Sequence, residues 1–399
     1  MEEWKEYKLG DVCKVINGRA YKHEELLDVG KYKVLRVGNI FQGNNWYYSD
    51  LELPEDKYCN KGDLLYAWSC GFAPYIWEGE KTIYHYHIWK LVENKKYVDR
   101  LFLYYYLIEN TKFFLGGTHG SVMLHLTKGD FEQQLINLPQ INIQRKIASI
   151  LKSLDDKIEV NRRLNENLEQ QAQALFKSWF VDFEPFKNGE FVESELGMIP
   201  KGWRVGTLNE LCSFISRGLT PKYDDSSDEL ILGQTCVRNN IVTLNNARKH
   251  KPKSKTEKWV QKWDVLLNST GIGSLGRVGI VYFQKDNVAI DSHITVVRTS
   301  SPLYRHYVGR NLLSRQMEIE KMAIGSTGQT ELPRDSVKAM PIIIPSDNVM
   351  EKFNCNIEPM ALAMYRSIEE NSRLASLRDT LLPRLMSGEL KVNEIENVL

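Results

Sequence analysis

The second half of this 399-residue chain repeats the first at an offset of about 200 residues, and a repeat of that length constrains the fold strongly. The opening segment 4–9 (WKEYKL) returns as 203–208 (WRVGTL). Further correspondences follow in the same order in both halves: Gly18-Arg19 with Arg217-Gly218, Lys61-Gly62-Asp63 with Lys262-Trp263-Asp264, Gly120-Ser121 with Gly325-Ser326, and Leu138-Pro139 with Ile344-Pro345. A long helical pattern follows each proline, so the chain has the order domain, helix, domain, helix.

Both helical patterns carry a heptad seam. A frame starting at Ile147 has apolar side chains at eight of ten seam positions, and the same frame from Phe353 has seven of ten. Asn161 and Asn371 fall at corresponding seam places, where asparagine costs stability but fixes register and partner. The residues expected to pair the helices are Leu151, Leu154, Ile158, Asn161, Leu168, Leu175, Met364, Asn371, Leu374 and Leu381. The alternative is that each helix packs only on its own domain.

Proline and glycine positions mark the boundaries between these parts. Pro359 either kinks the second helix or marks its true start. A linker rich in proline, glycine and charge separates the two copies. The expected parts are a first domain (1–142), a first helix (143–182), the linker (183–200), a second domain (201–346), a second helix (347–390) and a tail (391–399).

Composition excludes several classes of protein. No apolar stretch reaches the roughly 18 residues that a membrane helix needs, and the start lacks a signal peptide pattern, so we expect a cytoplasmic protein without membrane contact. Six scattered cysteines form no Cys-x-x-Cys pair, so zinc and disulfides are not indicated.

The net charge of +1 hides an asymmetry between the two halves. Residues 1–142 have 17 basic against 19 acidic side chains, and residues 196–345 have 21 against 13. The basic half fits phosphate contacts or an ordinary solvated surface.

Four segments resemble the specificity subunits of type I restriction enzymes, and the resemblance covers essentially the whole chain. Residues 138–151 (LPQINIQRKIASIL) resemble the start of the first spacer helix of that family, and 174–183 (ALFKSWFVDF) resemble its end. Residues 195–203 (ELGMIPKGW) resemble the start of the second recognition domain, and 381–390 (LLPRLMSGEL) resemble the usual close. All four in this order are a strong signal.

The resemblance implies an α+β protein with an internal pseudo-twofold repeat: two mixed α/β target recognition domains joined by two long antiparallel coiled-coil helices. Each domain would read one half of a bipartite site on double-stranded DNA. The helices would set the gap and dock two methyltransferase subunits, and motor-nuclease subunits would join this core. A helix of about 37 residues spans roughly 55 Å, a length comparable with one to one and a half turns of DNA.

Catalytic motifs are missing from the chain. It has no Asn-Pro-Pro-aromatic methylation motif and no Walker loop. Gly271-x-Gly273-x-x-Gly276 resembles a dinucleotide fingerprint, but a strand pattern (277–283) follows where a helix is required, so a glycine turn between strands is expected. His85 and His87 lack an evident third metal ligand. We therefore expect a recognition subunit without catalytic residues, metal or cofactor; S-adenosylmethionine, ATP and magnesium would bind partner subunits, which in the assembled complex would perform adenine-N6 methylation and ATP-dependent cleavage.

Candidate DNA contacts are the Arg, Asn, Gln, Ser and Thr residues of predicted loops, because these side chains read base edges. Turn chemistry is the usual alternative for such residues. The basic run 248–255 is a candidate phosphate grip or a solvated loop. The candidates are Arg19, Arg36, Asn39, Thr118, His119, Ser121, Arg217, Gln234, Arg238, Asn239, Asn240, Lys251, Lys253, Ser269, Thr270, Arg277, Ser326, Thr327 and Gln329.

Two rival functions are open at this point. A complete fused methyltransferase and nuclease conflicts with the missing motifs and with the length that two domains and two helices already use. A coiled-coil scaffold that binds proteins without reading DNA is the other, and salt-sensitive DNA binding would exclude it.

Overall fold

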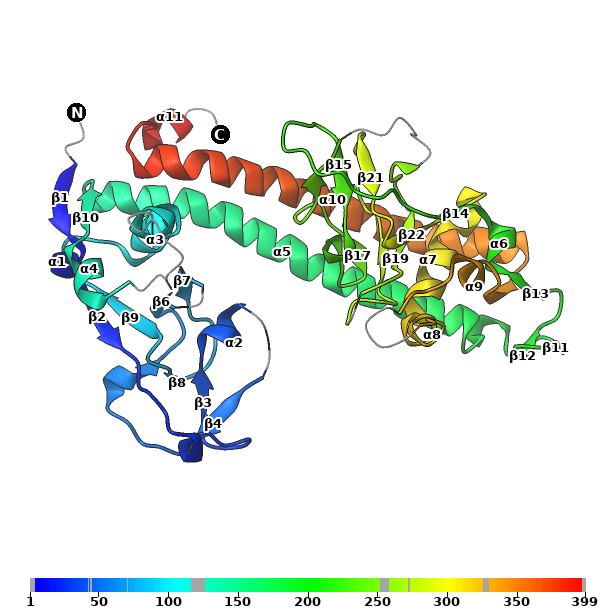
Figure 1. Cartoon of the computed structure of the whole chain (residues 1–399), viewed down its shortest axis with the longest axis horizontal. Coiled ribbons are helices and arrows are strands. Elements are labelled where there is room, and N and C mark those ends of the chain that lie inside the picture. The colour runs from blue at the N-terminus through cyan, green and yellow to red at the C-terminus, as the bar shows by residue number, and fades with distance from the viewer. Residues whose placement is uncertain are drawn as a thin grey trace. The chain divides into compact units, whose positions relative to one another are not determined.

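The computed structural model consists of two compact units, one made of Met1–Lys157 and Leu374–Leu399 and the other of Ile158–Arg373. We call them unit 1 and unit 2. Both contain sheets and parts of two 40-residue helices, α5 (Ile141–Phe180) and α10 (Asp347–Met386) (Figure 1). The structure describes residues 4–41, 43, 45–69, 71–115, 126–251, 258–271, 273–325 and 330–396.

Unit 1 contains two four-stranded sheets and one separate strand pair. The antiparallel sheet has the order β2 (Cys13–Asn17), β9 (Ile88–Glu93), β6 (Leu64–Ala67), β7 (Ala73–Ile76). The mixed sheet has the order β4 (Tyr47–Ser49), β3 (Tyr32–Leu35), β8 (Thr82–Tyr84), β5 (Tyr58–Cys59). The remaining elements are β1 (Lys5–Lys8) paired with β10 (Leu135–Leu138), and the helices α1 (Leu9–Val12), α2 (Val37–Phe41), α3 (Arg100–Leu115), α4 (Lys128–Gln133) and α11 (Val392–Glu396).

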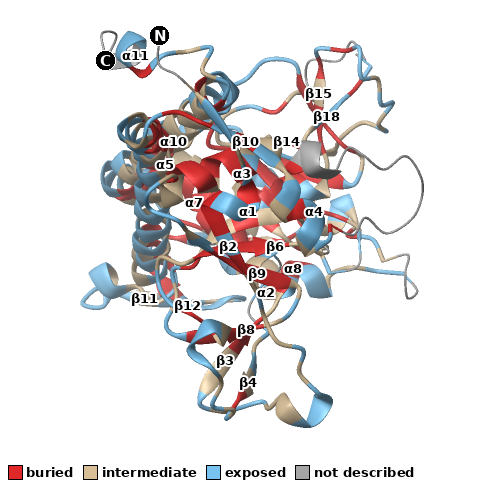
Figure 2. Cartoon of the chain, turned by 90° about the vertical axis from the view of Figure 1, so that its left-hand side faces the viewer, coloured by how far each residue is buried: buried red, intermediate tan, exposed pale blue. Residues whose placement is uncertain are grey.

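Burial explains the strand sequences of unit 1. All four residues of β6 are buried and apolar, because helix α3 and the mixed sheet cover its two faces, and β9 is buried over most of its length (Figure 2). Strand β2 instead alternates between buried and exposed residues, the pattern of a strand with one face on the core.

Unit 2 repeats these elements with a longer main sheet. Its order is β14 (Cys212–Arg217), β22 (Ile294–Thr299), β19 (Val265–Asn268), β20 (Val278–Ile280), β17 (Ile241–Val242), β16 (Val237–Arg238). The smaller sheet is β18 (Arg248–Lys249), β15 (Leu230–Leu232), β21 (Val288–Ile290). The other elements are the pairs β13 (Arg204–Thr207) with β23 (Pro341–Ile344) and β11 (Phe191–Ser194) with β12 (Gly197–Pro200), and the helices α6 (Leu208–Leu211), α7 (Arg305–Ser314), α8 (Gln316–Lys321) and α9 (Arg334–Lys338).

The repeat predicted from the sequence is present in the strand pairings. The antiparallel order β2-β9-β6-β7 matches β14-β22-β19-β20, and the parallel pair β3/β8 matches β15/β21. The glycine in each repeated turn has the same role: a Cβ on Gly18 would lie 2.3 Å from the His85 carbonyl oxygen, and one on Gly218 would lie 1.9 Å from that of Ile290. Only glycine permits this close backbone approach.

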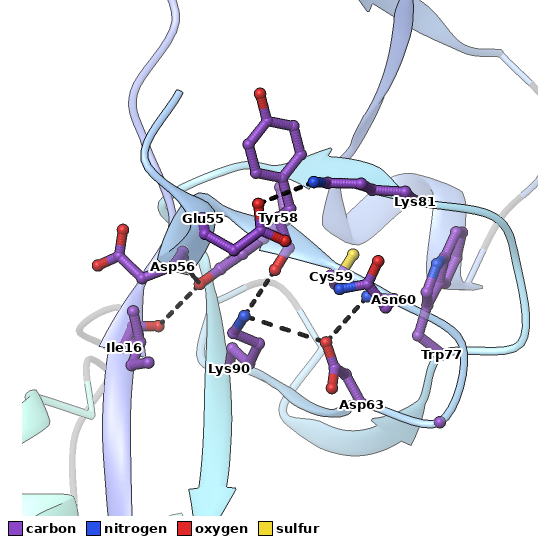
Figure 3. Close-up of polar contacts among 12 residues, drawn as sticks. Ile16, Glu55, Asp56, Tyr58, Cys59, Asn60, Asp63, Trp77, Lys81 and Lys90 are labelled. Carbon is purple, nitrogen blue, oxygen red and sulfur yellow. Dashed lines mark hydrogen bonds and ion pairs between the residues drawn. The ribbon is translucent and has the colours of Figure 1, made fainter. Parts of the chain in front are cut away.

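The repeated Lys-x-Asp motif has a structural role in both copies. Asp63 and Asp264 each accept a hydrogen bond from the backbone N–H three residues earlier. Each carboxylate also faces a cation from the neighbouring strand. Lys90 lies 4.0 Å from Asp63 and donates to the Tyr58 carbonyl at 2.6 Å (Figure 3), and Arg298 lies 2.7 Å from Asp264.

In unit 2, α5 and α10 pair in antiparallel fashion. The Phe180 and Phe353 rings lie 4.8 Å apart at one end, and Asn161 Nδ2 donates to Asn371 Oδ1 at 2.9 Å at the other. Asn161 is almost fully buried and donates to Glu370 as well. The apolar contacts between these ends come from Leu168, Ala172, Leu175, Phe176, Ile357, Ala361 and Met364.

The same two helices also meet in unit 1. Asp155 on α5 accepts hydrogen bonds from Arg378 on α10 and from the Tyr105 hydroxyl on α3, both at 2.7 Å. Leu151 is fully buried in the cluster that holds Leu382 of α10, and Leu381 packs against that cluster. Leu154, Ile158 and Leu374 are half-buried.

Helix α10 runs from Asp347 to Met386 without interruption at Pro359, so the second helix does not start at this proline. Because proline has no N–H, the carbonyl of Cys355 lacks the usual donor four residues later. Helix α5 begins and ends two residues before the expected 143–182. In the part of the chain that the structure describes, no helix combines the length and apolarity needed to cross a membrane.

Candidate nucleic-acid interface

Three loops of unit 2 meet at one edge of its sheets because of the strand directions. β15 and β21 are parallel, so the 3-10 turn after β15 (Gln234–Cys236) and the turn after β21 lie at the same edge. β19 and β22 are antiparallel with Asn268 opposite Ile294, so the residues after β19 face those before β22. Residues far apart in the sequence therefore converge.

Gln234, Thr270 and His293 form a hydrogen-bonded chain across these loops. Gln234 Nε2 donates to Thr270 Oγ1 at 3.0 Å, and Thr270 Oγ1 lies 2.8 Å from His293 Nδ1. We call this chain the edge triad. His293 is exposed, and Gln234 and Thr270 are half-buried, so the triad faces solvent.

Arg217 ties a fourth segment to this edge. Its guanidinium donates to the Leu332 carbonyl at 2.7 Å and lies 2.8 Å from the Glu331 carboxylate. Glu331 also forms a β-bridge with Thr270, which places the segment after residue 329 beside the edge triad. Arg217 and Thr270 therefore share one surface, although Arg217 is held by protein partners.

The fingerprint-like glycines form a hairpin turn. β19 and β20 pair antiparallel on either side of the turn, as the strand pattern after it predicts. Gly271, Gly273 and Gly276 all have positive φ, which other residues adopt only under strain. Arg277 donates to the Gly273 carbonyl at 2.7 Å and so closes the turn.

Arg238, Asn239 and Asn240 lie on the hairpin between β16 and β17. Both asparagines have positive φ, so they form a two-residue type I′ turn, for which asparagine is a preferred residue. The Asn240 amide oxygen accepts a hydrogen bond from Gln316 at 3.2 Å. Asn240 is thus occupied by turn geometry and an internal contact, whereas Arg238 is exposed and has no partner among the described residues.

Ser269, a predicted DNA contact, has a fully buried side chain. It bonds the Thr295 hydroxyl at 2.7 Å in the sheet interior and cannot reach a nucleic acid in this structure. Lys251 is exposed beside Arg248, which stacks on the Tyr223 ring at 3.4 Å. Seven candidates lie outside the described residues: Thr118, His119, Ser121, Lys253, Ser326, Thr327 and Gln329.

The unit 1 candidates that the structure describes, Arg19, Arg36 and Asn39, are engaged in local contacts. Arg19 forms a two-bond ion pair with Glu25, at 2.9 and 2.7 Å. Arg36 and Asn39 both donate to the Asn45 carbonyl, at 3.1 and 2.9 Å. These contacts occupy all three side chains within the protein.

Sequence reasoning missed an aromatic cluster at the matching turn of unit 1. The Trp68 indole donates to the Tyr86 carbonyl at 2.7 Å and packs against His87 with ring centroids 5.3 Å apart. His85 and His87 lie in a turn and not on a strand, with centroids 4.9 Å apart. Burial first, then His87 and Arg36, lower the pKa of His85 to about 4, so it is uncharged at neutral pH.

His293 was also missed, although the repeat carries a signal for it. The turns before β9 and β22 both end in a His-Ile pair, His87-Ile88 and His293-Ile294. Aligning the halves on these dipeptides would have identified the position. The two turns share a histidine and differ in what surrounds it.

Comparison with known proteins adds family evidence. The family model described as the type I restriction modification DNA specificity domain matches residues 1–170. The type I restriction enzyme MjaIX specificity subunit of Methanocaldococcus jannaschii is 30% identical over 289 residues, which are 69% of this chain and 65% of that protein. This alignment therefore spans just under two thirds of the relative.

Two other comparisons cover nearly the whole chain. The HindI specificity subunit of Haemophilus influenzae is 24% identical over 481 residues, 98% of this chain and 100% of that protein. The crystal structure of the type I restriction-modification system S subunit from M. genitalium has a TM-score of 0.60 at 16% identity and covers 96% of both chains. That similarity shows a common fold.

Proposed function

The chain belongs to the family of type I restriction enzyme specificity subunits, and we propose that it selects the DNA target of such an enzyme without catalysing a reaction itself. Each sheet domain would read one half of a bipartite site on double-stranded DNA. We infer a cytoplasmic location, since the subunit needs access to DNA.

The duplicated architecture is the observation that carries this proposal. Each copy has the same antiparallel order of four strands, the same parallel strand pair, the same glycine-dependent turn and a long helix after it. A protein built from two equivalent readers suits a target with two parts. The edge triad and the exposed Arg238 supply hydrogen-bond donors of the kind that read bases or phosphates.

The paired helices would set the gap between the two half-sites. A continuous 40-residue helix is a rigid spacer, and the pair of the buried Asn161 with Asn371 on its seam favours one register over others. We propose that α5 and α10 also dock two methyltransferase subunits, with motor-nuclease subunits joining that core. S-adenosylmethionine, ATP and magnesium would bind those partners.

Methylation mapping tests the proposal directly. The chain is expressed with its candidate methyltransferase subunit in a methylation-free host, and modified adenines are read by single-molecule sequencing. A split motif with a fixed gap and one modified adenine on each strand is expected. Absence of new methylation from an assembled complex supplied with its cofactor would contradict the recognition role.

The basic residues around β18 are proposed to grip phosphates. Replacing Arg248, Lys249 and Lys251 with glutamine should weaken binding to all sequences alike and reduce the slope of log affinity against log salt, by about one unit for each phosphate that is no longer neutralised. Glutamine at Lys285, an exposed lysine elsewhere in unit 2, is the matched control. Unchanged binding and salt slope would assign these residues to a solvated surface.

A further inference from the structure

The edge triad holds one imidazole in a defined orientation at the surface of unit 2. The main chain of His293 is held on both sides, because its N–H donates to Asp291 at 2.8 Å and its carbonyl accepts from the Ser269 N–H at 2.9 Å. Its ring is held by Thr270 at Nδ1. The remaining ring nitrogen, Nε2, has no partner among the described residues, and the side chain is exposed.

The hydrogen-bond chain determines which atom His293 presents to solvent. The nitrogen of the Gln234 side-chain amide, Nε2, is a donor, so Thr270 Oγ1 accepts from it. The Thr270 hydroxyl hydrogen is then available for Nδ1 of His293, and in the tautomer that accepts it the imidazole hydrogen lies on Nε2. The result is a single N–H donor with a fixed direction.

An oriented single donor suits one kind of DNA contact. Base edges in the major groove display acceptors, N7 on both purines and O6 or O4 on guanine or thymine. A donor that is already oriented loses little entropy on binding, which suits a contact with one particular acceptor atom. A phosphate contact has no such requirement, because a flexible lysine or arginine can make it without a supporting hydrogen-bond chain. We propose that His293 is a specificity-determining residue that donates from Nε2 to an acceptor on a base edge within the half-site read by unit 2. This inference rests on the proposed function.

The other copy of the repeat supports the assignment to specificity. His87 occupies the same turn in unit 1 but packs against Trp68 and Tyr86 instead of a Thr–Gln chain. One scaffold position thus carries the same residue in two different surroundings. Two readers that recognise different half-sites need this combination of a common backbone and different surface chemistry.

The test measures binding of the assembled methyltransferase complex to duplexes that each change one base pair of the mapped motif. The wild-type complex is measured first. If its methylation shows no split motif, that result contradicts the proposed function and not the assignment of His293. His293→Ala is expected to lose about 10- to 100-fold discrimination at one position of the half-site read by unit 2, with the other half-site unchanged. Thr270→Val, which removes the relay, should weaken discrimination at that same position. His293→Gln, which keeps an N–H donor, should restore part of it.

Two outcomes would overturn the assignment. Equal weakening on all duplexes, with a smaller salt slope, would make His293 a phosphate contact. Unchanged discrimination at every position in His293→Ala would show that the triad only shapes its loop. Thermal unfolding of each variant separates these results from damage to the fold, because a variant that folds normally keeps the unfolding midpoint of the wild-type chain.

Discussion

Removing Glu169 should destabilise unit 2 far more than removing any surface carboxylate. Arg310 on α7 is only 1% exposed, and its guanidinium pairs with Glu169 on α5 at 2.5 Å and donates to the Tyr282 hydroxyl at 2.6 Å. Glu169→Leu leaves a buried charge without its counterion, which costs about 3–5 kcal/mol. For a domain of this size, that corresponds to a fall in Tm of roughly 6–20 °C.

A double variant tests the reasoning behind that number. Replacing a buried ion pair by apolar residues of similar volume is often neutral, so Glu169→Leu with Arg310→Met should regain most of the stability. Arg310→Met alone should cost less than Glu169→Leu, because the Glu169 side chain is 16% exposed and stays partly hydrated.

Thermal and urea unfolding of the full chain measure these differences. Glu166→Leu is the matched control on the same helix, since Glu166 pairs with Arg162 at the surface and should contribute less than about 1 kcal/mol. If Glu169→Leu is as stable as Glu166→Leu, or if the double variant is no more stable than Glu169→Leu, then Arg310 is not a buried charge that needs Glu169.

Three further predictions concern single features of the fold. Gly218→Ala should lower the free energy of unfolding in urea by about 1–3 kcal/mol, because its Cβ would meet a backbone carbonyl. Gly233→Ala is the control and should be close to neutral, because the space around Gly233 is open. Equal losses of stability in the two variants would refute the close-packing argument. Hydrogen bonds from the histidine and then the arginine that open α7 lower the pKa of Glu358 to about 2. Between about pH 2 and 4 the Glu358 carboxylate stays ionised in the folded state, whereas in the unfolded chain, with a pKa near about 4.3, it becomes protonated. Its contribution to the free energy of unfolding is therefore complete above about pH 5 and is lost as the pH falls toward about 2. Glu358→Gln should flatten this part of the stability curve, and an unchanged acid limb would contradict the assignment. Replacing both Asn161 and Asn371 with leucine should raise Tm while loosening the helix register, detectable as methylation at motifs with altered gaps; an unchanged gap would show that other contacts set the register.

The repeat made much of the architecture predictable from sequence. Self-similarity between the halves predicts two copies of one domain, and the matched strand orders of the two units agree with this. Heptad periodicity is a local property of the chain, so it predicted both long helices and placed Asn161 and Asn371 at equivalent seam positions. The strand-like residues after Gly276 predicted a hairpin turn, and β19 and β20 form one.

The candidate site depended on non-local strand pairing. Gln234, Thr270 and His293 converge only because β15 runs parallel to β21 and β19 antiparallel to β22, and no local pattern encodes those pairings. Loop composition predicted Thr270 and Ser269 equally as DNA contacts. In the structure Thr270 lies at the surface and Ser269 is fully buried.

The sequence by itself therefore determined the duplicated domains, the two helices and the glycine turns, because each follows from short-range periodicity, steric limits or self-similarity. The tertiary structure decided which polar residues share a surface and which are enclosed. Arg310 illustrates the difference, because its burial against Glu169 arises from packing between segments far apart in the chain. Local rules govern the elements of this fold, and long-range pairing and packing govern its site.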